Sequence, residues 1–176
     1  MSETSRYRSL TSLHCRDLNG VPLTVLDVAS QGDPVVPWAW QLDLPPEEFK
    51  HYSGGRDPVG IQLAGHADKL PVASNSLDVL YSSHFLEDNL DWRPFLREWT
   101  RVVKRGGKII ILLPDKERWD YAVQHLKQPV NCAHKHEAYV GELSSYAAEM
   151  GWRVIEDRLT ECHPNDYNIL FVAVKV

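Results

Sequence analysis

Cysteine, long apolar runs and basic residues are all scarce in this sequence, and each shortage excludes a class of protein. The three cysteines, Cys15, Cys132 and Cys162, are an odd number without a close pair, which favours a reducing, cytoplasmic compartment over a disulfide framework. No apolar run approaches the roughly 20 residues that cross a bilayer, and the first ten residues, MSETSRYRSL, lack the apolar region of a signal peptide. We therefore expect no membrane association.

The charge balance argues against nucleic acid as the main partner. The formal net charge is −5, whereas binding to a phosphate backbone relies on an excess of Lys and Arg. This balance also counts against methylation of RNA. The 176 residues, 43% hydrophobic and 24% charged, are typical of one globular domain spanning 1–176.

Short apolar runs alternate with amphipathic segments, a pattern typical of a sheet covered by helices on both faces. The expected strands are 23–28, 38–43, 59–64, 77–83, 108–114, 152–159 and 168–176. The expected helices are 91–107, 115–127 and 137–150, with a further helix between the second and third strands. Because the last two strands follow each other without a helix, we expect an antiparallel hairpin at one edge. The predicted fold is α/β, a Rossmann-like, doubly wound and mostly parallel sheet.

Glycine is scarce in VLDVASQGDP, where an apolar strand ends in an acid. Ala29, Ser30 and Gln31 occupy the places where a nucleotide-binding loop has closely spaced glycines, and Gly32 comes only after them. Only residues 28–42 separate Asp27 from Asp43, which is too short for a full crossover helix. We expect one helical turn or none.

Polar residues gather where four predicted strands end: at Asp27 and its loop, at Asp43, at Ala67-Asp68 and at Ser83-His84. In open parallel sheets, ligands bind beyond the carboxyl ends of the strands, so the pattern indicates a ligand site. Taken singly, each residue could instead be a turn cap or a strand-end hydroxyl.

Three segments, 65–88, 95–115 and 134–157, resemble the middle and carboxyl-terminal parts of class I S-adenosylmethionine-dependent methyltransferases of type 11. The resemblance rests on "LPVASNSLDVLYSSHFLED" followed by "LREWTRVVKRGG" and a strand, and it covers about half of the chain. It implies methyl transfer from S-adenosylmethionine to an oxygen or nitrogen of a small-molecule acceptor.

The resemblance also implies a set of site residues. Asp43 would accept hydrogen bonds from the ribose hydroxyls, Asp68 would accept one from the adenine amino group, and His84 would lie near the acceptor. The implied cofactor-binding residues are Asp27, Ala29, Ser30, Gly32, Asp43, Ala67, Asp68 and Ser83. Backbone amides around Ala29 to Gly32 would hold the methionine end. His84 and His134 are the candidate catalytic residues, because histidine titrates in the useful range.

Several alternatives stay open. A non-catalytic binding or assembly module of the same fold would have lost the glycines together with the cofactor. Cys132, His134 and His136 alternate along the chain as zinc ligands could, but they lack a second paired cluster, so no metal site is expected. Trp38 and Trp40 could form an apolar surface for a homodimer or lie in the core.

Overall fold

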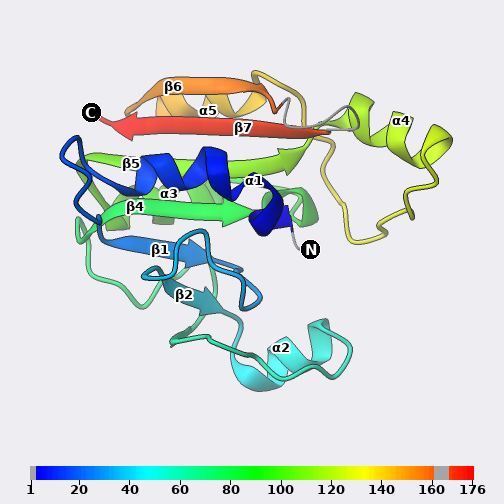
Figure 1. Ribbon diagram of the computed structural model, residues 1–176, viewed down its shortest axis with the longest axis horizontal. Helices are drawn as coiled ribbons and strands as arrows, with labels where there is room; N and C mark the ends of the chain where they lie inside the picture. Colours follow the sequence, from blue (N-terminus) through cyan, green and yellow to red (C-terminus); the bar gives the residue numbers. More distant parts are fainter. Residues whose placement is uncertain (1–2, 161–166) are drawn as a thin grey trace.

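The computed structural model describes residues 3–160 and 167–176, which build one seven-stranded sheet (Figure 1). The strands are β1 (Val25–Val28), β2 (Trp40–Asp43), β3 (Leu63–Ala64), β4 (Leu77–Ser83), β5 (Val103–Pro114), β6 (Trp152–Leu159) and β7 (Asn168–Lys175). Their order is β3-β2-β1-β4-β5-β7-β6. The first five strands are parallel, and β7 lies antiparallel between β5 and β6. The predicted doubly wound sheet with an antiparallel edge hairpin is confirmed.

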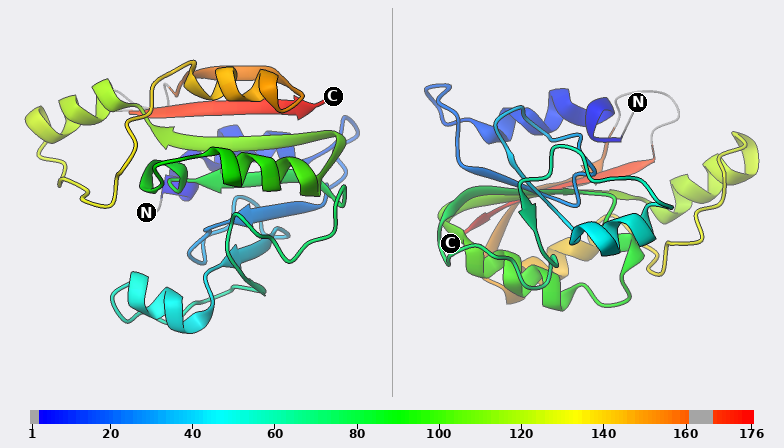
Figure 2. Two further views of the ribbon diagram at one scale, coloured as in Figure 1. Left: turned by 180° about the vertical axis from the view of Figure 1, so that it is seen from behind. Right: turned by 90° about the horizontal axis from the view of Figure 1, so that it is seen from below.

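Helices cover both faces of the sheet, as the side-on view in Figure 2 shows. The helices are α1 (Glu3–Thr11), α2 (Pro46–Tyr52), α3 (Arg93–Val102), α4 (Lys116–His125) and α5 (Glu142–Glu149), with short 3-10 turns η1 (Ser12–Cys15) and η2 (Leu86–Asp88). α1 lies over one face, and α3 and α5 lie over the other, whereas α2 and α4 project beyond the sheet (Figures 1 and 2). None of the described helices is long and apolar enough to cross a membrane.

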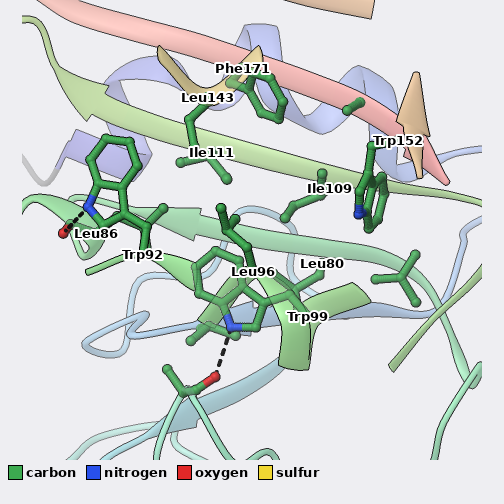
Figure 3. Packing of buried hydrophobic residues seen from close by; sticks show 14 of the residues in the cluster. Leu80, Leu86, Trp92, Leu96, Trp99, Ile109, Ile111, Leu143, Trp152 and Phe171 are labelled. Carbon is green, nitrogen blue, oxygen red and sulfur yellow. Dashed lines mark hydrogen bonds between the residues drawn. The ribbon is translucent and has the colours of Figure 1, made fainter. Parts of the chain in front are cut away.

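The largest apolar cluster lies under α3 and α5 and includes two buried tryptophans of the α3 segment (Figure 3). Trp92 donates its indole N–H to the carbonyl of Leu86 at 2.8 Å, and Trp99 donates to the carbonyl of Ala67 at 2.9 Å. Each indole therefore fills the core while its polar edge is satisfied. Leu86 begins η2 and Ala67 lies in the loop after β3, so these bonds hold two segments at the carboxyl end of the sheet.

No helix forms between β1 and β2, as the short spacing predicts. Residues 29–39 make turns instead, and Val35 and Val36 pack in a second apolar cluster with Tyr7 and Cys15. The face that a crossover helix would cover is thus covered by the turns and by α1. The sequence did not predict α1, because Tyr7 is the one fully buried apolar residue among 3–11.

Several predicted boundaries are wrong. The helix predicted over 91–107 ends at Val102, because Val103 already pairs with Leu77 as part of β5. Gly106 does adopt a left-handed φ of +75°, but within an irregular part of this strand pair. The strand predicted over 59–64 shrinks to β3, because Gly60, with a φ of +73°, turns the chain. The helix predicted over 137–150 is the shorter α5, and the helix predicted over 115–127 is α4, with Asp115 as its N-cap.

Candidate functional site

A cavity of about 380 Å³ lies beyond the carboxyl ends of β1, β2 and β4, within the range of about 300–1,000 Å³ found for small-molecule sites. Its walls combine carboxylates, aromatic rings and backbone. The lining residues are Ala29, Gln31, Asp43, Leu44, Tyr52, His66, Ala67, Asp68, His84, Phe85, Asp88, Asn89, Phe95, Ala133 and Lys135. Five residues from the sequence prediction are among them: Ala29, Asp43, Ala67, Asp68 and His84.

Asp43 is buried at the end of β2, and both of its carboxylate oxygens already accept a hydrogen bond. Oδ2 accepts from the amide of Gln31 at 3.0 Å, and Oδ1 accepts from the amide of Leu44 at 2.9 Å. Burial raises the pKa of this carboxyl, and the two amides oppose that rise. Because each carboxylate oxygen has two lone pairs, Asp43 can still accept from two hydroxyls of a ligand.

The loop after β1 keeps a glycine-type backbone without the glycines. Ala29 has a φ of +60° and Gln31 a φ of +48°, values that only glycine adopts without strain. Gly32 has a φ of +83°, and a Cβ there would lie 2.5 Å from the carbonyl oxygen of Val59. The loop therefore follows a strained path that places Ala29 and Gln31 in the cavity wall.

The amides of this loop are mostly engaged within the protein. Ala29 donates to the carbonyl of Leu42 at 2.9 Å, Gln31 donates to Asp43, and Gly32 donates to the hydroxyl of Ser30 at 3.4 Å. A ligand carboxylate would thus meet fewer available amides here than in a glycine-rich loop.

Three predicted cofactor residues support the loop from outside the cavity wall. Asp27 is buried, and its Oδ2 accepts from the amide of Val35 at 2.7 Å. Burial raises the pKa of Asp27 well above its usual range. Ser30 donates to the side chain of Gln41 at 3.1 Å, and Gly32 provides the close approach to Val59. Asp27, Ser30 and Gly32 are not among the lining residues.

His84 follows β4 and lines the cavity, whereas Ser83, the last residue of β4, does not. The amide of His84 donates to the carbonyl of Leu112 at 3.0 Å, and its backbone takes a left-handed φ of +52°. The ring Nδ1 lies 3.0 Å from Oε1 of Glu87, whose side chain is 2% exposed. Both the backbone and the ring of His84 are therefore held in place.

His134 also lies near Glu87. Its Nε2 is 3.9 Å from the same Oε1 atom, and its ring packs 5.0 Å from that of Trp119. His134 is absent from the first cavity and lines a second one. One buried carboxylate thus links the two predicted catalytic histidines.

The opposite wall of the first cavity is closed by α2 and η2. Tyr52 donates its hydroxyl to Oδ2 of Asp88 at 3.0 Å, while Oδ1 of Asp88 is buried without a hydrogen-bond partner among the described residues. Burial and then the neighbouring Glu87 raise the pKa of Asp88. Burial and Asp88 raise the pKa of Tyr52 to about 12. The cavity therefore holds an acidic wall that suits a positively charged ligand.

The sequence prediction gave no role to the side chains of five residues that lie in or beside this cavity: Gln31, Tyr52, Glu87, Asp88 and Lys135. Glu87 and Asp88 end the motif that carries the resemblance, whereas Tyr52 and Lys135 belong to no motif.

The candidate zinc ligands are separated. Cys132 is exposed and free, and His134 lies near Glu87. His136 is 2.6 Å from Glu142 and packs on Trp92. Within residues 3–160 and 167–176, no group of three or more such side chains is placed to hold a metal ion. Cys162 lies outside the described residues.

Comparisons with known proteins agree with this geometry. Residues 39–111, which include Asp43, Asp68 and His84, match the family model of the methyltransferase domain. No curated protein matches the sequence.

Solved structures with the same fold have low sequence identity to the chain. An S-adenosylmethionine-dependent methyltransferase from Aquifex aeolicus is 20% identical, with a TM-score of 0.61 and 100% of both chains covered. A second from Mesorhizobium loti is 15% identical, with a TM-score of 0.64, 87% of this chain and 91% of that chain covered. A chain from the Haloferax volcanii complex of the Trm112 methyltransferase activator with a methyltransferase is 16% identical, with a TM-score of 0.66, 96% of this chain and 89% of that chain covered. The chain therefore has the fold of the class I S-adenosylmethionine-dependent methyltransferases, and its segment 39–111 is similar to the methyltransferase domain.

Proposed function

We propose that the chain binds S-adenosylmethionine in the first cavity and transfers its methyl group to an oxygen or nitrogen of a small molecule. The observation that carries the proposal is the meeting of Asp43, Asp68 and His84 around one cavity, each from a different strand end. The acidic wall at Asp88 suits the positive charges of the sulfonium and the ammonium groups.

The residues fit the parts of the cofactor. Asp43 has lone pairs left for the two ribose hydroxyls, and Asp68 is exposed at the mouth, where it can accept from an amino group. Ala67, Phe85 and Phe95 supply apolar contacts for a flat base. At the methionine end, the wall is formed by Ala29 and Gln31, with Ser30 and Gly32 supporting the loop from behind.

The cofactor supplies a methyl group that is already activated on a sulfonium. The protein has to align the acceptor and, for a hydroxyl, remove its proton. His84 lines the cavity and is oriented by Glu87, so we assign it the role of base. His134 shares the Glu87 carboxylate and could take the proton onward.

Calorimetry with S-adenosylhomocysteine tests the cofactor assignment. We expect wild-type binding, and a loss of about 10-fold or more in Asp68→Ala, since a hydrogen bond to a charged group contributes roughly 1.5–3 kcal/mol. Asp68 is exposed, so its replacement should leave the fold intact. Asp57→Ala is the matched control, because this carboxylate is exposed, pairs with Lys50 and does not line the cavity.

Absence of binding at about 10 mM S-adenosylhomocysteine would reject the cofactor assignment. Equal affinities for wild type and Asp68→Ala would remove Asp68 from the site and favour a binding module of the same fold.

The cellular compartment and the class of the acceptor belong to the same proposal. We place it in the cytoplasm with a small-molecule acceptor, on the basis of the free Cys15 and Cys132. Of the two tryptophans considered for a homodimer, Trp38 packs against the core and Trp40 is half exposed. Gel filtration at several concentrations would determine whether a dimer forms.

A further inference from the structure

A second cavity of about 400 Å³ borders the first one, between α4 and the segment before α5. It is lined by Pro114, Lys116, Trp119, Val130, Asn131, His134, Lys135, His136, Glu137 and Ala138. Lys135 lines both cavities. Pro114 is the last residue of β5, so the second cavity also lies beyond a carboxyl strand end, next to the first.

The border between the two cavities is anchored on Glu87. The carbonyl of Glu87 accepts from the amides of Lys135 at 2.7 Å and His136 at 2.9 Å. Its Oε1 lies 3.0 Å from Nδ1 of His84 and 3.9 Å from Nε2 of His134. Its Oε2 is buried and has no hydrogen-bond partner in the part of the chain that the structure describes. Buried carboxylate oxygens normally accept a hydrogen bond, so the unsatisfied Oε2 indicates that a donor group of a ligand can bind at this border.

Some basic side chains around the second cavity have an acidic partner, and one does not. Lys116 pairs with Asp120 and lies 3.5 Å from Glu137, and His136 pairs with Glu142. Lys135 is exposed, and its ammonium makes no ion pair or hydrogen bond with the residues that the structure describes. Its charge acts on Asp88, where it opposes the rise in pKa, but of the two lysines that line the cavities Lys135 is the one without an ion-pair partner within 4 Å in the described chain.

An aromatic wall lies beside this cation. The ring of Trp119 is 5.0 Å from that of His134 and 5.1 Å from that of Tyr167, which stands edge-on to it. A half-buried indole in the wall of a cavity offers a flat face to a ring, and Asn131 adds a polar group nearby.

We propose that the second cavity binds the methyl acceptor, and that the acceptor is a small ring compound with a carboxylate that Lys135 binds. The inference rests on the proposed function. Three carboxylates and one lysine line the first cavity, whereas two lysines and one carboxylate line the second, so a ligand carboxylate beside Lys135 is favoured on the side of the second cavity. With its ring against Trp119, the acceptor reaches the border at Glu87, where His84 faces the first cavity.

Calorimetry with matched probes, with and without saturating S-adenosylhomocysteine, tests the proposal. One pair is 3,4-dihydroxybenzoate and its neutral counterpart 3,4-dihydroxybenzyl alcohol, and the other is galacturonate and methyl galactoside. We expect at least one acid to bind, about fivefold or more tightly than its neutral counterpart, since a charged hydrogen bond adds roughly 1 kcal/mol or more. The two pairs distinguish an aromatic acid from a sugar acid.

Two variants assign the binding to the second cavity. Lys135→Gln, an exposed position, should abolish the preference for the acid, and Trp119→Leu should weaken both members of a pair. Lys127→Gln, which changes an exposed lysine outside both cavities, should leave every affinity unchanged.

The proposal is overturned if neither acid binds at about 10 mM, if acid and neutral probe bind equally, or if Lys135→Gln has no effect. It is also overturned if Lys135→Gln weakens S-adenosylhomocysteine, because Lys135 would then belong to the cofactor site. If an acid binds but S-adenosylhomocysteine does not, only the cofactor assignment is rejected. If S-adenosylhomocysteine binds but neither acid does, only this inference is rejected.

Discussion

Oε1 of Glu87 lies 3.0 Å from Nδ1 of His84. An ionised carboxylate can only accept a hydrogen bond, so Nδ1 carries the proton in this contact. In the neutral ring, Nε2 is then the basic nitrogen, which is the state that a base requires. Glu87 acts here through His84 and is a positioning residue.

The tautomer of His84 can be read directly by ¹⁵N NMR of the histidine rings. We expect the Nδ1–H form in wild type, and a mixture of tautomers in Glu87→Gln, because the amide can donate as well as accept. Glu142→Gln is the control: it should alter the signals of His136, 2.6 Å away, and leave those of His84 unchanged. A His84 spectrum that is insensitive to Glu87→Gln would contradict the assignment.

The strained loop predicts two stabilising substitutions. Ala29→Gly and Gln31→Gly should each raise the free energy of unfolding by roughly 0.5–1 kcal/mol, because relief of a left-handed φ exceeds the entropy cost of glycine. Urea denaturation measures the change. Ala73→Gly, at an exposed position without a positive φ, should be neutral or destabilising. Destabilisation by both loop variants would show that the side chains matter more than the strain.

The ion pair between Arg8 and Asp33 ties α1 to the loop. The two side chains approach to 2.5 Å, and Ser5 donates to the same carboxylate at 2.6 Å. Both partners are about a third exposed, so a double-mutant cycle of Arg8→Ala and Asp33→Asn should give a coupling of only about 0.5–1 kcal/mol. The coupling should shrink at high salt. A salt-independent coupling would argue against an electrostatic tie.

The raised pKa of Asp27 predicts a pH dependence of stability. Above the unfolded-state pKa of about 4, the folded chain holds a proton that the unfolded chain has lost. Stability therefore falls as pH rises, until the folded-state pKa is passed. Asp43 and Asp88, whose pKa values are also raised, contribute with the same sign.

Asp27→Asn should flatten this fall, because asparagine stays neutral and keeps an oxygen for the amide of Val35. Chemical denaturation between about pH 5 and pH 8 measures the slope. Asp57→Asn, at an exposed carboxylate, should keep the wild-type slope. A slope in Asp27→Asn as steep as in wild type would place the protonation elsewhere.

Continuous apolar strands were predictable from the sequence, and irregular segments were not. The bounds of β4 and β6 agree with the predicted 77–83 and 152–159. β4 is an almost fully buried apolar run, whereas β6 is an edge strand that alternates exposed and less exposed residues. α1 was missed because its buried positions are mostly polar: Thr4 and Thr11 are buried, and Tyr7 is the one fully buried apolar residue. The early end of α3 reflects the pairing of Val103 with Leu77, a contact between distant segments.

Some residues of the candidate site could likewise be predicted from the sequence, and others could not. Asp43 ends a strand and Asp68 and His84 come after strands, so the rule that ligands bind at carboxyl strand ends predicted that they lie around one cavity. Glu87 and Lys135 meet through a hydrogen bond between segments almost 50 residues apart in the sequence, and no local pattern encodes that contact. Prediction of these residues required the three-dimensional arrangement of η2 and the segment before α5.

The position of β7 has a consequence for the synthesis of the protein. β6 joins the sheet only through β7, which pairs with β5 on its other side. While residues 168–175 are still inside the ribosome, the emerging chain can assemble β1 to β5 but leaves the edge of β5 open and β6 detached. Completion of the sheet therefore waits for the insertion of β7 between β5 and β6, and until then the open edge of β5 can pair with other chains.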